Sequence, residues 1–220
     1  MILAIDTATK SVSLALTAGD ATLAESTWQS ANNHTIELAP AVKRMLSEAR
    51  VSAESLVAVA VAIGPGSFTG VRIGLAFAKG LALARRLPLI GVRTLDIAVR
   101  PLPLSTAHAI AVLQAGRGRV VWARYQAGAR GWESASAGEV GRWEEVAAQA
   151  SSGECVIGEI DPAGFDLLTG RGIKMAEPSD NARRATYLAH IAWERWRRGE
   201  ADSAETLAPI YAHQPTSGNA

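Results

Sequence analysis

The chain has 220 residues, of which 48% are hydrophobic, and a formal net charge of +1. A chain of this length and composition can build one large domain or two small lobes with proper cores. The near-neutral charge excludes a general electrostatic attraction for nucleic acid. The single cysteine, Cys155, excludes an internal disulfide and is typical of the cytoplasm. Its apolar neighbours predict a small buried side chain rather than a nucleophile.

The beginning of the chain and its most apolar stretch predict a cytoplasmic protein without a membrane anchor. A strand-like run at 2–5 follows Met1 directly, with no basic segment before it. The apolar stretch at 73–84 is shorter than the about 20 residues that a membrane-spanning helix requires, and it contains Lys79.

The first half of the chain predicts three strands, followed by helices and strands in alternation. Alternating apolar and polar residues indicate the second strand, and continuous apolar runs indicate buried ones. Asn32 and Asn33 can cap the first helix, whose apolar residues recur at helical spacing. The strands are expected at 2–6, 11–17, 21–28, 56–63 and 89–92, and the helices at 35–50, 70–86 and 94–100. This order is that of the first half of a ribonuclease-H-like lobe.

The second half of the chain predicts a similar succession, which is a pattern of elements and not a sequence repeat. The strands are expected at 107–113, 119–126, 132–136 and 154–157, and the helices at 142–150 and 181–198. Pro101-Leu102-Pro103 breaks the chain between the halves. We therefore expect an α/β protein with an N-terminal lobe at 1–103 and a C-terminal lobe at 104–220.

A glycine-rich segment at 64–70, Gly-Pro-Gly-Ser-Phe-Thr-Gly, invites a nucleotide-binding interpretation. Its third glycine comes one residue too late for the dinucleotide-binding fingerprint. Val71-Arg72 stands where a P-loop has lysine and then serine or threonine, and the spacing around Ser67 does not fit a nucleophile elbow. We interpret the segment as a strand-to-helix turn with unusual backbone angles. An anion at the following helix N-terminus stays open.

Asp6 is the one acidic residue in a strong position, because it ends the first strand, where α/β sheets present ligands. Two interpretations stay open. Asp6 could face a phosphate or metal ion, with Thr7 and Thr9 as further nucleotide-facing residues, or it could form a turn by hydrogen bonding to its own backbone. The four histidines are widely separated, so no metal site is predicted, and no Ser-His-Asp set can be assigned.

The helix expected at 70–86 is apolar on nearly every side. A helix of this kind must be buried on all sides. Its small residues form one row at Gly70, Gly74, Ala78 and Ala82, and another at Ala76, Gly80 and Ala84. Glycine in a helix costs about 0.5–1 kcal/mol relative to alanine, so glycine is tolerated best where another backbone comes close. The side away from its own sheet requires the first helix, another subunit or both, and a wholly intramolecular helix is the alternative.

Arginines lie near tryptophans towards the end of the chain. Arg183 and Arg184 lie near the start of the helix expected at 181–198, which also carries Trp193 and Trp196 with further arginines, a combination that can stack on RNA bases and bind phosphates. Interleaved acidic residues and the position near a helix C-terminus favour a solvated helix end instead.

Several blocks of the sequence resemble the TsaB (YeaZ) family. They are residues 2–9, 64–74 and 79–82, with a weaker likeness at 207–211. The likeness covers essentially the whole chain and is most specific in residues 1–95. It implies the actin-like (ASKHA) fold with two ribonuclease-H-like lobes, which agrees with the order of elements.

The resemblance also implies a function and a partner surface. The chain would be a non-catalytic scaffold that binds TsaD, the subunit that transfers a threonylcarbamoyl group to adenosine 37 of tRNA. TsaE would join through the TsaB–TsaD complex, TsaC would supply the threonylcarbamoyl-adenylate, and tRNA would be contacted only indirectly. A homodimer of the isolated chain is left open. The partner surface would lie on the first two helices, at Leu38, Val42, Met45, Val71, Gly74, Leu75, Ala78, Leu81 and Ala82.

The sequence departs from the family pattern in the second lobe. Gln114 stands where an acidic residue is usual, and His213 where arginine is usual. The metal site of TsaD uses an H-x-x-x-H pair, whereas His34 is followed here by Leu38. The resemblance therefore implies no catalytic metal and no tightly bound cofactor, with a nucleotide at an interface shared with TsaD left open. The alternative from another class is a small-molecule kinase or ATPase of the same fold, and a peptidase would need a nucleophile or metal that is not found.

Overall fold

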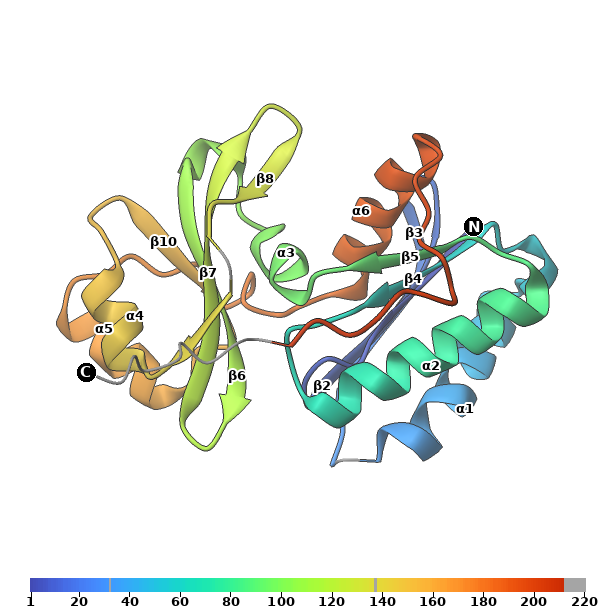
Figure 1. Ribbon diagram of the computed structural model, residues 1–220, viewed down its shortest axis with the longest axis horizontal. Helices are drawn as coiled ribbons and strands as arrows, with labels where there is room; N and C mark the ends of the chain where they lie inside the picture. The colour runs from blue at the N-terminus through green and yellow to red at the C-terminus, as the bar shows by residue number, and fades with distance from the viewer. Residues whose placement is uncertain (32, 137, 212–220) are drawn as a thin grey trace. The chain divides into compact units, whose positions relative to one another are not determined.

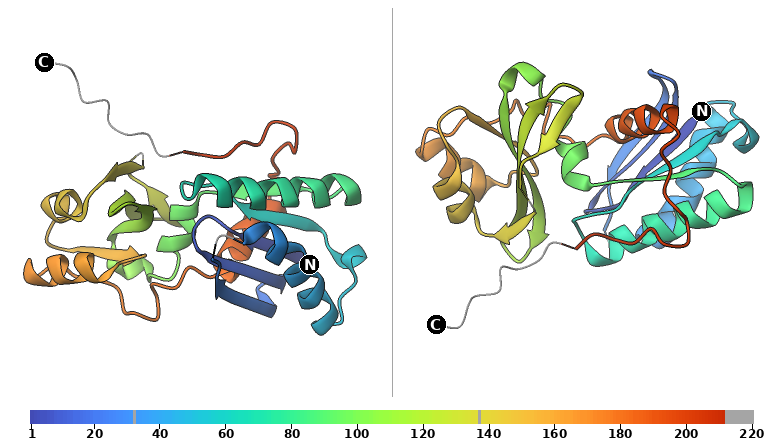
Figure 2. Two further views of the ribbon diagram at one scale, coloured as in Figure 1. Left: turned by 90° about the horizontal axis from the view of Figure 1, so that it is seen from below. Right: turned by 45° about the horizontal axis from the view of Figure 1, so that its top comes forward.

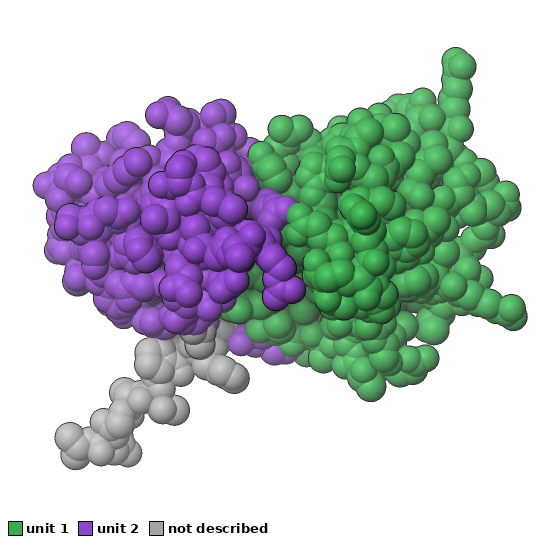
Figure 3. All heavy atoms as spheres, turned by 90° about the horizontal axis from the view of Figure 1, so that it is seen from above, with its two compact units in different colours: residues 1–97, 183–210 green, residues 98–182, 211–220 purple. Residues whose placement is uncertain are grey.

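The computed structural model describes residues 1–31, 33–136 and 138–211, and His213 lies outside these ranges. The chain forms two compact units (Figure 3). Of the described residues, unit 1 contains 1–97 and 183–210, and unit 2 contains 98–182 and Tyr211. None of the helices in the described ranges combines the length and apolar character needed to cross a bilayer.

Unit 1 is built on a five-stranded sheet with the strand order β3-β2-β1-β4-β5. β1, β2 and β3 pair antiparallel, while β1, β4 and β5 run parallel. The strands are β1 (Ile2–Asp6), β2 (Ser11–Ala18), β3 (Ala21–Gln29), β4 (Ala58–Ala62) and β5 (Leu89–Val92). The helices are α1 (His34–Glu48), α2 (Phe68–Arg85) and α6 (Ala185–Arg197), with a short 3-10 turn at Ala53–Ser55, and α3 (Thr94–Val99) begins in unit 1 and ends in unit 2. The predicted order of strands and helices through residue 99 is confirmed.

The two faces of this sheet differ in side-chain size, because successive residues of a strand point to opposite faces. The larger side chains of β1 and β4, such as Leu3 and Val59, pack with α1 and α2. The alanines, such as Ala4 and Ala60, pack with α6. Figure 1 shows α1 and α2 on one side of the sheet and α6 on the other. The small side chains let α6 lie close to the sheet, and each face buries a separate apolar layer.

The position of α6 corrects the predicted lobes. Residues 181–198 were expected to form a helix of the C-terminal lobe, and the division was expected at 103. The structure assigns α6 to unit 1 and places the first division after Ile97. The apolar stripe of the helix, which includes Leu188 and Ala192, predicts packing on a sheet but does not specify which sheet.

The last described residues cover the edge of unit 1 at β5. The carboxylate of Asp202 accepts a hydrogen bond from the backbone N–H of Gly91 at 2.7 Å, and the guanidinium of Arg195 donates to the Gly91 carbonyl at 2.7 Å. Farther along, the N–H of Ile210 donates to the carbonyl of Ile63 at 2.7 Å. Backbone groups at this edge are therefore used within the chain, which removes a template for pairing with other strands.

The two rows of small residues on α2 have different surroundings. Gly70 and Gly74 face the end of β1, where a Cβ would lie 2.2 Å from the carbonyl oxygen of Thr7 and 2.2 Å from its Oγ1, respectively. Thr7 Oγ1 donates a hydrogen bond to the Gly70 carbonyl at 2.7 Å, so it is not free to move away. Gly80 is exposed, and a Cβ there would meet nothing within 4 Å. Close backbone approach therefore explains Gly70 and Gly74 but not Gly80.

We expect opposite effects from alanine at two of these glycines. Gly74→Ala should lower the free energy of unfolding by about 1–3 kcal/mol, because the new methyl group overlaps Thr7. Gly80→Ala should raise it by about 0.5–1 kcal/mol, because it removes only backbone entropy from the unfolded chain. Urea unfolding measures both values. In a Thr7→Ala background the cost of Gly74→Ala should fall, and equal effects of the two glycine substitutions would contradict this account.

Unit 2 contains a smaller sheet with the order β10-β6-β7-β8, in which β9 also pairs with β7. α4 and α5 contribute to a core with residues of β6, β7 and β10 around Trp122 and Trp143. The strands are β6 (His108–Gly116), β7 (Arg119–Gly128), β8 (Gly131–Ser134), β9 (Glu139–Gly141) and β10 (Glu154–Gly158), and the helices are α4 (Trp143–Gln149) and α5 (Pro162–Gly170), with a 3-10 turn at Leu104–Thr106. Figure 2 shows the elements of each unit from two further directions.

Two elements of unit 2 were not predicted. β9 has only 3 residues, which is too short for an alternation to be recognised. α5 begins with a readable signal, because the carboxylate of Asp161 accepts a hydrogen bond from the N–H of Gly164 at 2.8 Å and Pro162 is the first helical residue. The prediction contains no helix at this position, although Asp161 and Pro162 form a local start signal.

Candidate functional site

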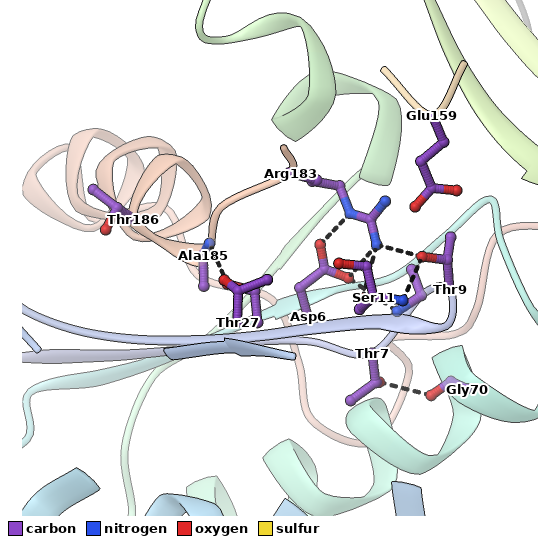
Figure 4. Close-up of polar contacts among 12 residues, drawn as sticks. Asp6, Thr7, Thr9, Ser11, Thr27, Gly70, Glu159, Arg183, Ala185 and Thr186 are labelled. Carbon is purple, nitrogen blue, oxygen red and sulfur yellow. Dashed lines mark hydrogen bonds and ion pairs between the residues drawn. The ribbon is translucent and has the colours of Figure 1, made fainter. Parts of the chain in front are cut away.

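Asp6 lies at the end of β1, and its carboxylate is fully buried. Its Oδ1 accepts a hydrogen bond from the backbone N–H of Ala8 at 2.9 Å. This bond confirms the interpretation of Asp6 as a turn-forming residue. Its Oδ2 accepts a hydrogen bond from Nε of Arg183 at 2.5 Å, and this pair is the centre of the polar cluster in Figure 4. A buried carboxylate requires such a partner, because an unpaired buried charge is strongly unfavourable.

Arg183 connects Asp6 to the turn that follows β1. It lies 177 positions from Asp6 in the sequence and is only 4% exposed. Its Nη2 also donates to Oγ1 of Thr9 at 3.0 Å and to the carbonyl of Ser11 at 3.3 Å. The expectation of a solvated position for Arg183 is therefore wrong, because its guanidinium is the buried counter-charge of the Asp6 carboxylate.

The structure brings together the three residues predicted to face a nucleotide, but it pairs each of them within the chain. Asp6 binds Arg183 and the Ala8 N–H, Thr9 binds Arg183, and Thr7 binds the first turn of α2. All three side chains are buried. The nucleotide-facing interpretation of Asp6, Thr7 and Thr9 is not supported in this arrangement, because the carboxylate charge is already compensated by Arg183.

The glycine-rich segment 64–70 is a tightly packed turn between β4 and α2. Gly64 has φ of +100°, which favours glycine, and this confirms the predicted unusual backbone angle. A Cβ on Gly64 would lie 2.2 Å from the carbonyl oxygen of Ile210, and one on Gly66 would lie 2.2 Å from that of Ala8. Ser67 caps α2, since its Oγ accepts a hydrogen bond from the Gly70 N–H at 3.2 Å. The glycines therefore serve close contact with other backbone segments of unit 1.

Polar side chains of β2 and β3 bind the beginning of α6. Oγ of Ser13 accepts a hydrogen bond from the N–H of Ala185 at 2.9 Å, and Glu25 accepts one from the N–H of Thr186 at 2.9 Å. Glu25 also pairs with Arg184. Burial raises the pKa of Glu25, but the hydrogen bonds from Thr186 and Arg184 outweigh this effect and hold the pKa below its ordinary value. Glu25 thus helps to fix α6 on the sheet.

This lowered pKa predicts a pH dependence of stability. A carboxyl group with a lowered pKa in the folded state contributes stability above its unfolded pKa and loses it as the pH falls through the folded pKa. We expect Glu25→Gln to lower the free energy of unfolding at neutral pH by about 1 kcal/mol, and this difference to shrink as the pH falls from about 4 towards 3. Urea unfolding between pH 3 and 7 measures it. Glu177→Gln, at an exposed position of unit 2, is the control. A difference between wild type and Glu25→Gln that does not change with pH would contradict the role of the charge.

Gln114 occupies a polar cluster in unit 2. Its side-chain amide donates to the carbonyl of Glu159 at 2.9 Å and to the carboxylate of Asp161 at 3.2 Å. Its backbone N–H donates to the Glu159 carboxylate at 3.1 Å. The amide NH₂ group therefore acts as a donor between acidic residues, which a carboxylate at position 114 could not do. Among the described residues, no group of three or more histidine, cysteine, aspartate and glutamate side chains could hold a metal ion.

The residues predicted for the partner surface lie mainly inside unit 1. All except Leu81, which is partly buried, are fully buried and pack within the chain. Their assignment to a surface is therefore wrong. Apolar residues at helical spacing mark the side of a helix that faces its own core, and on α1 and α2 this side faces the sheet. The residues concerned are Leu38, Val42, Met45, Val71, Gly74, Leu75, Ala78 and Ala82.

An apolar surface remains on the opposite side of the same helices. Ile36 of α1 is 71% exposed, and Phe68 and Leu83 of α2 are 56% and 58% exposed. Ala76 and Gly80 lie between them along α2 and are also exposed. We call these five residues the outer face of α1 and α2. The second small-residue row of α2 belongs to this face, which the sequence pattern could not distinguish from the buried row.

Comparisons with known proteins agree with this architecture. A family model described as "TsaD: tRNA N6-adenosine threonylcarbamoyltransferase" matches residues 23–167. The structure of the activator of 2-hydroxyisocaproyl-CoA dehydratase from Clostridium difficile has a TM-score of 0.57 at 10% identity and covers 96% of this chain and 99% of that chain, which shows a common fold. The chain is thus an α/β protein of the actin-like class, and the predicted fold is confirmed.

More similar proteins identify the family within this class. The Escherichia coli protein named tRNA threonylcarbamoyladenosine biosynthesis protein TsaB is 34% identical over 96% of this chain and 93% of its own length. The structure of YeaZ from Pseudomonas aeruginosa has a TM-score of 0.77 at 27% identity and covers 96% of this chain and 98% of that chain. The chain belongs to the TsaB (YeaZ) family.

Proposed function

We propose that this chain is a non-catalytic scaffold subunit in the formation of threonylcarbamoyladenosine in tRNA, and that it binds TsaD through the outer face of α1 and α2. The name of the Escherichia coli relative supports the pathway, and the match to a TsaD family model supports structural kinship with the proposed partner. Proteins that share a fold and bind each other through equivalent surfaces form pseudo-symmetric pairs, by the same geometry as twofold dimers.

The observation that carries the proposal is the exposed apolar surface on the outer face. Ile36, Phe68 and Leu83 are more than half exposed, and single exposed side chains of this size would need no explanation. On α2, however, Phe68 and Leu83 lie on the same side of the helix as Gly80, an exposed glycine within a long helix. Glycine at this position destabilises the isolated helix. No close contact within the chain requires a residue without a side chain there, because a Cβ would meet nothing within 4 Å. Close approach of a partner helix supplies a reason for glycine.

The polar cluster around Asp6 supports a scaffold rather than an independent kinase or ATPase. A phosphotransfer site of this fold would need the Asp6 carboxylate to face a metal ion and phosphate. In this chain, the guanidinium of Arg183 forms an ion pair with that carboxylate. We therefore propose that the isolated chain binds no nucleotide tightly, and that any nucleotide of the complex lies at an interface shared with TsaD.

The remaining partners follow from this scaffold role. TsaE would bind the TsaB–TsaD complex rather than this chain alone, and TsaC would supply the threonylcarbamoyl-adenylate in the cytoplasm. The formal net charge of +1 supports a tRNA contact that is indirect, because phosphate binding rests mainly on clustered positive charge.

Reconstitution with TsaD from the same organism tests the proposal. Size-exclusion chromatography with light scattering should show a complex that contains both chains. Transfer of the threonylcarbamoyl group to tRNA should require this chain in addition to TsaD, TsaE and TsaC. Full transfer in its absence, or tight ATP binding and hydrolysis by the isolated chain, would refute the scaffold role.

A further inference from the structure

Phe68 is the first residue of α2 and the aromatic side chain of the outer face. It is 56% exposed, although its ring is apolar. The guanidinium carbon of Arg72, one turn farther along the helix, lies 3.5 Å from the ring centre, so a cation–π contact holds one face of the ring. Aromatic side chains are frequent anchors of protein interfaces, because they bury a large area and lose little rotamer freedom. The Phe68 ring is therefore a candidate anchor of the outer face.

The backbone that leads into Phe68 is held on two sides. The N–H of Ser67 donates a hydrogen bond at 2.6 Å to the carbonyl of Ala8, in the turn that follows β1. The carbonyl of Gly64 accepts a hydrogen bond at 2.9 Å from the N–H of Thr94, just after β5. This segment therefore cannot shift relative to the sheet without breaking these bonds.

Thr7 holds the first turn of α2 from inside unit 1. Its side chain is fully buried, and its Oγ1 donates to the Gly70 carbonyl at 2.7 Å. Figure 4 shows Thr7 pointing towards Gly70 and away from the side chain of Arg183, which binds Asp6. Asp6 and Thr7 are successive, and successive side chains of an extended chain point to opposite sides. The end of β1 therefore holds the polar cluster on one side and the start of α2 on the other.

We infer that Thr7 is a positioning residue for the TsaD interface. Together with the Ala8 carbonyl, it holds the first turn of α2 so that Phe68 is presented to the partner in a fixed place. Such preorganisation strengthens binding, because less conformational freedom is lost when the partner docks. This inference rests on the proposed function, because it assigns Phe68 to the surface that binds TsaD. It gives a role in partner binding to a buried hydroxyl that does not reach the surface.

Calorimetric titration with TsaD tests the anchor and its support. Phe68→Ala, a change at an exposed side chain, should weaken binding by about 30-fold or more. Thr7→Val keeps the shape of the side chain but removes the hydroxyl. It should weaken binding by about 3- to 10-fold, because the first turn of α2 is then ordered only on binding. Thr7→Ser retains the hydroxyl and should change the affinity by less than about 2-fold.

A double-mutant cycle shows whether Thr7 acts through Phe68. In the Phe68→Ala background, Thr7→Val should change the affinity by less than about 2-fold, because the ring that it positions is gone. Ser13→Ala is the control for general stability. It removes a buried hydroxyl that binds the N–H of Ala185 on the other face of the same sheet, and it should leave TsaD affinity unchanged. Circular dichroism checks that each variant is folded.

The outcomes separate the inference from the proposed function. If Phe68→Ala binds TsaD with wild-type affinity, Phe68 is not an anchor, and the inference is refuted while the scaffold role stands. The inference is also refuted if Thr7→Val has no effect, if its effect is the same with and without the Phe68 ring, or if Ser13→Ala weakens binding equally. If the wild-type chain binds no TsaD, the proposed function fails, and the inference fails with it.

Discussion

Arg183→Ala is expected to lower the free energy of unfolding by about 3–5 kcal/mol, because it leaves the Asp6 carboxylate buried without a counter-charge. Asp6 is 0% exposed, and its remaining hydrogen bond comes from the Ala8 N–H. Thr9 and the Ser11 carbonyl would lose their bonds to the same guanidinium. Urea unfolding followed by tryptophan fluorescence measures the effect.

The neighbouring residue provides the control. Arg184 pairs with Glu25, but its side chain is 52% exposed, so Arg184→Ala should cost no more than about 1 kcal/mol. The double substitution Asp6→Ala/Arg183→Met should be less damaging than the sum of its parts, because it removes both charges together. A loss of less than about 1 kcal/mol for Arg183→Ala would show that water or another group compensates Asp6.

Ala76→Glu is expected to abolish TsaD binding, with a loss of about 100-fold or more in affinity, while leaving the fold intact. Ala76 is exposed at the centre of the outer face, so a glutamate is solvated in the free chain. In the complex, the same side chain would place an unpaired charge in an apolar contact. Light scattering and calorimetry with TsaD measure the loss, and circular dichroism checks the fold.

The choice of position decides whether this experiment is informative. Leu75→Glu or Ala78→Glu would place a charge in the core of unit 1, where it would prevent folding and so prove nothing about a partner. Ala163→Glu, at an exposed position of α5, makes the same chemical change on another helix and should leave TsaD binding unchanged. If TsaD binds the Ala76→Glu variant with wild-type affinity, the outer face is not part of the interface.

The sequence predicted the strands and helices of unit 1 well, because periodicity and turn residues act locally. It could not distinguish the two small-residue rows of α2, since the row at Gly74 packs on Thr7 and the row at Gly80 is exposed. Both rows have the same spacing, and only the position of the sheet separates them. The predicted partner surface therefore consisted mainly of core residues and did not include the exposed Ala76.

The central ion pair shows a second limit of sequence reasoning. Asp6 was recognised from its place at the end of β1, but Arg183 follows a long intervening unit and has no local signal. A buried acidic residue requires a counter-charge, yet the sequence offers many arginines that could supply it. The missed start of α5 is different, because Asp161 and Pro162 form a local helix-start signal that could have been read.

The discontinuity of unit 1 has a consequence for the synthesis of the protein. When residues 1–97 have emerged from the ribosome, the strands of the unit 1 sheet and helices α1 and α2 have been made. Helix α6, which covers the other face of this sheet, is still absent. The core of unit 2 lies within residues 98–182, so it can form before α6 is made, in agreement with the general tendency of domains to fold as units during translation. The alanine-lined face of the earliest strands stays in water until residues 183–198 emerge. The sheet formed by residues 1–97 can therefore complete its native packing only after α6 has been synthesised.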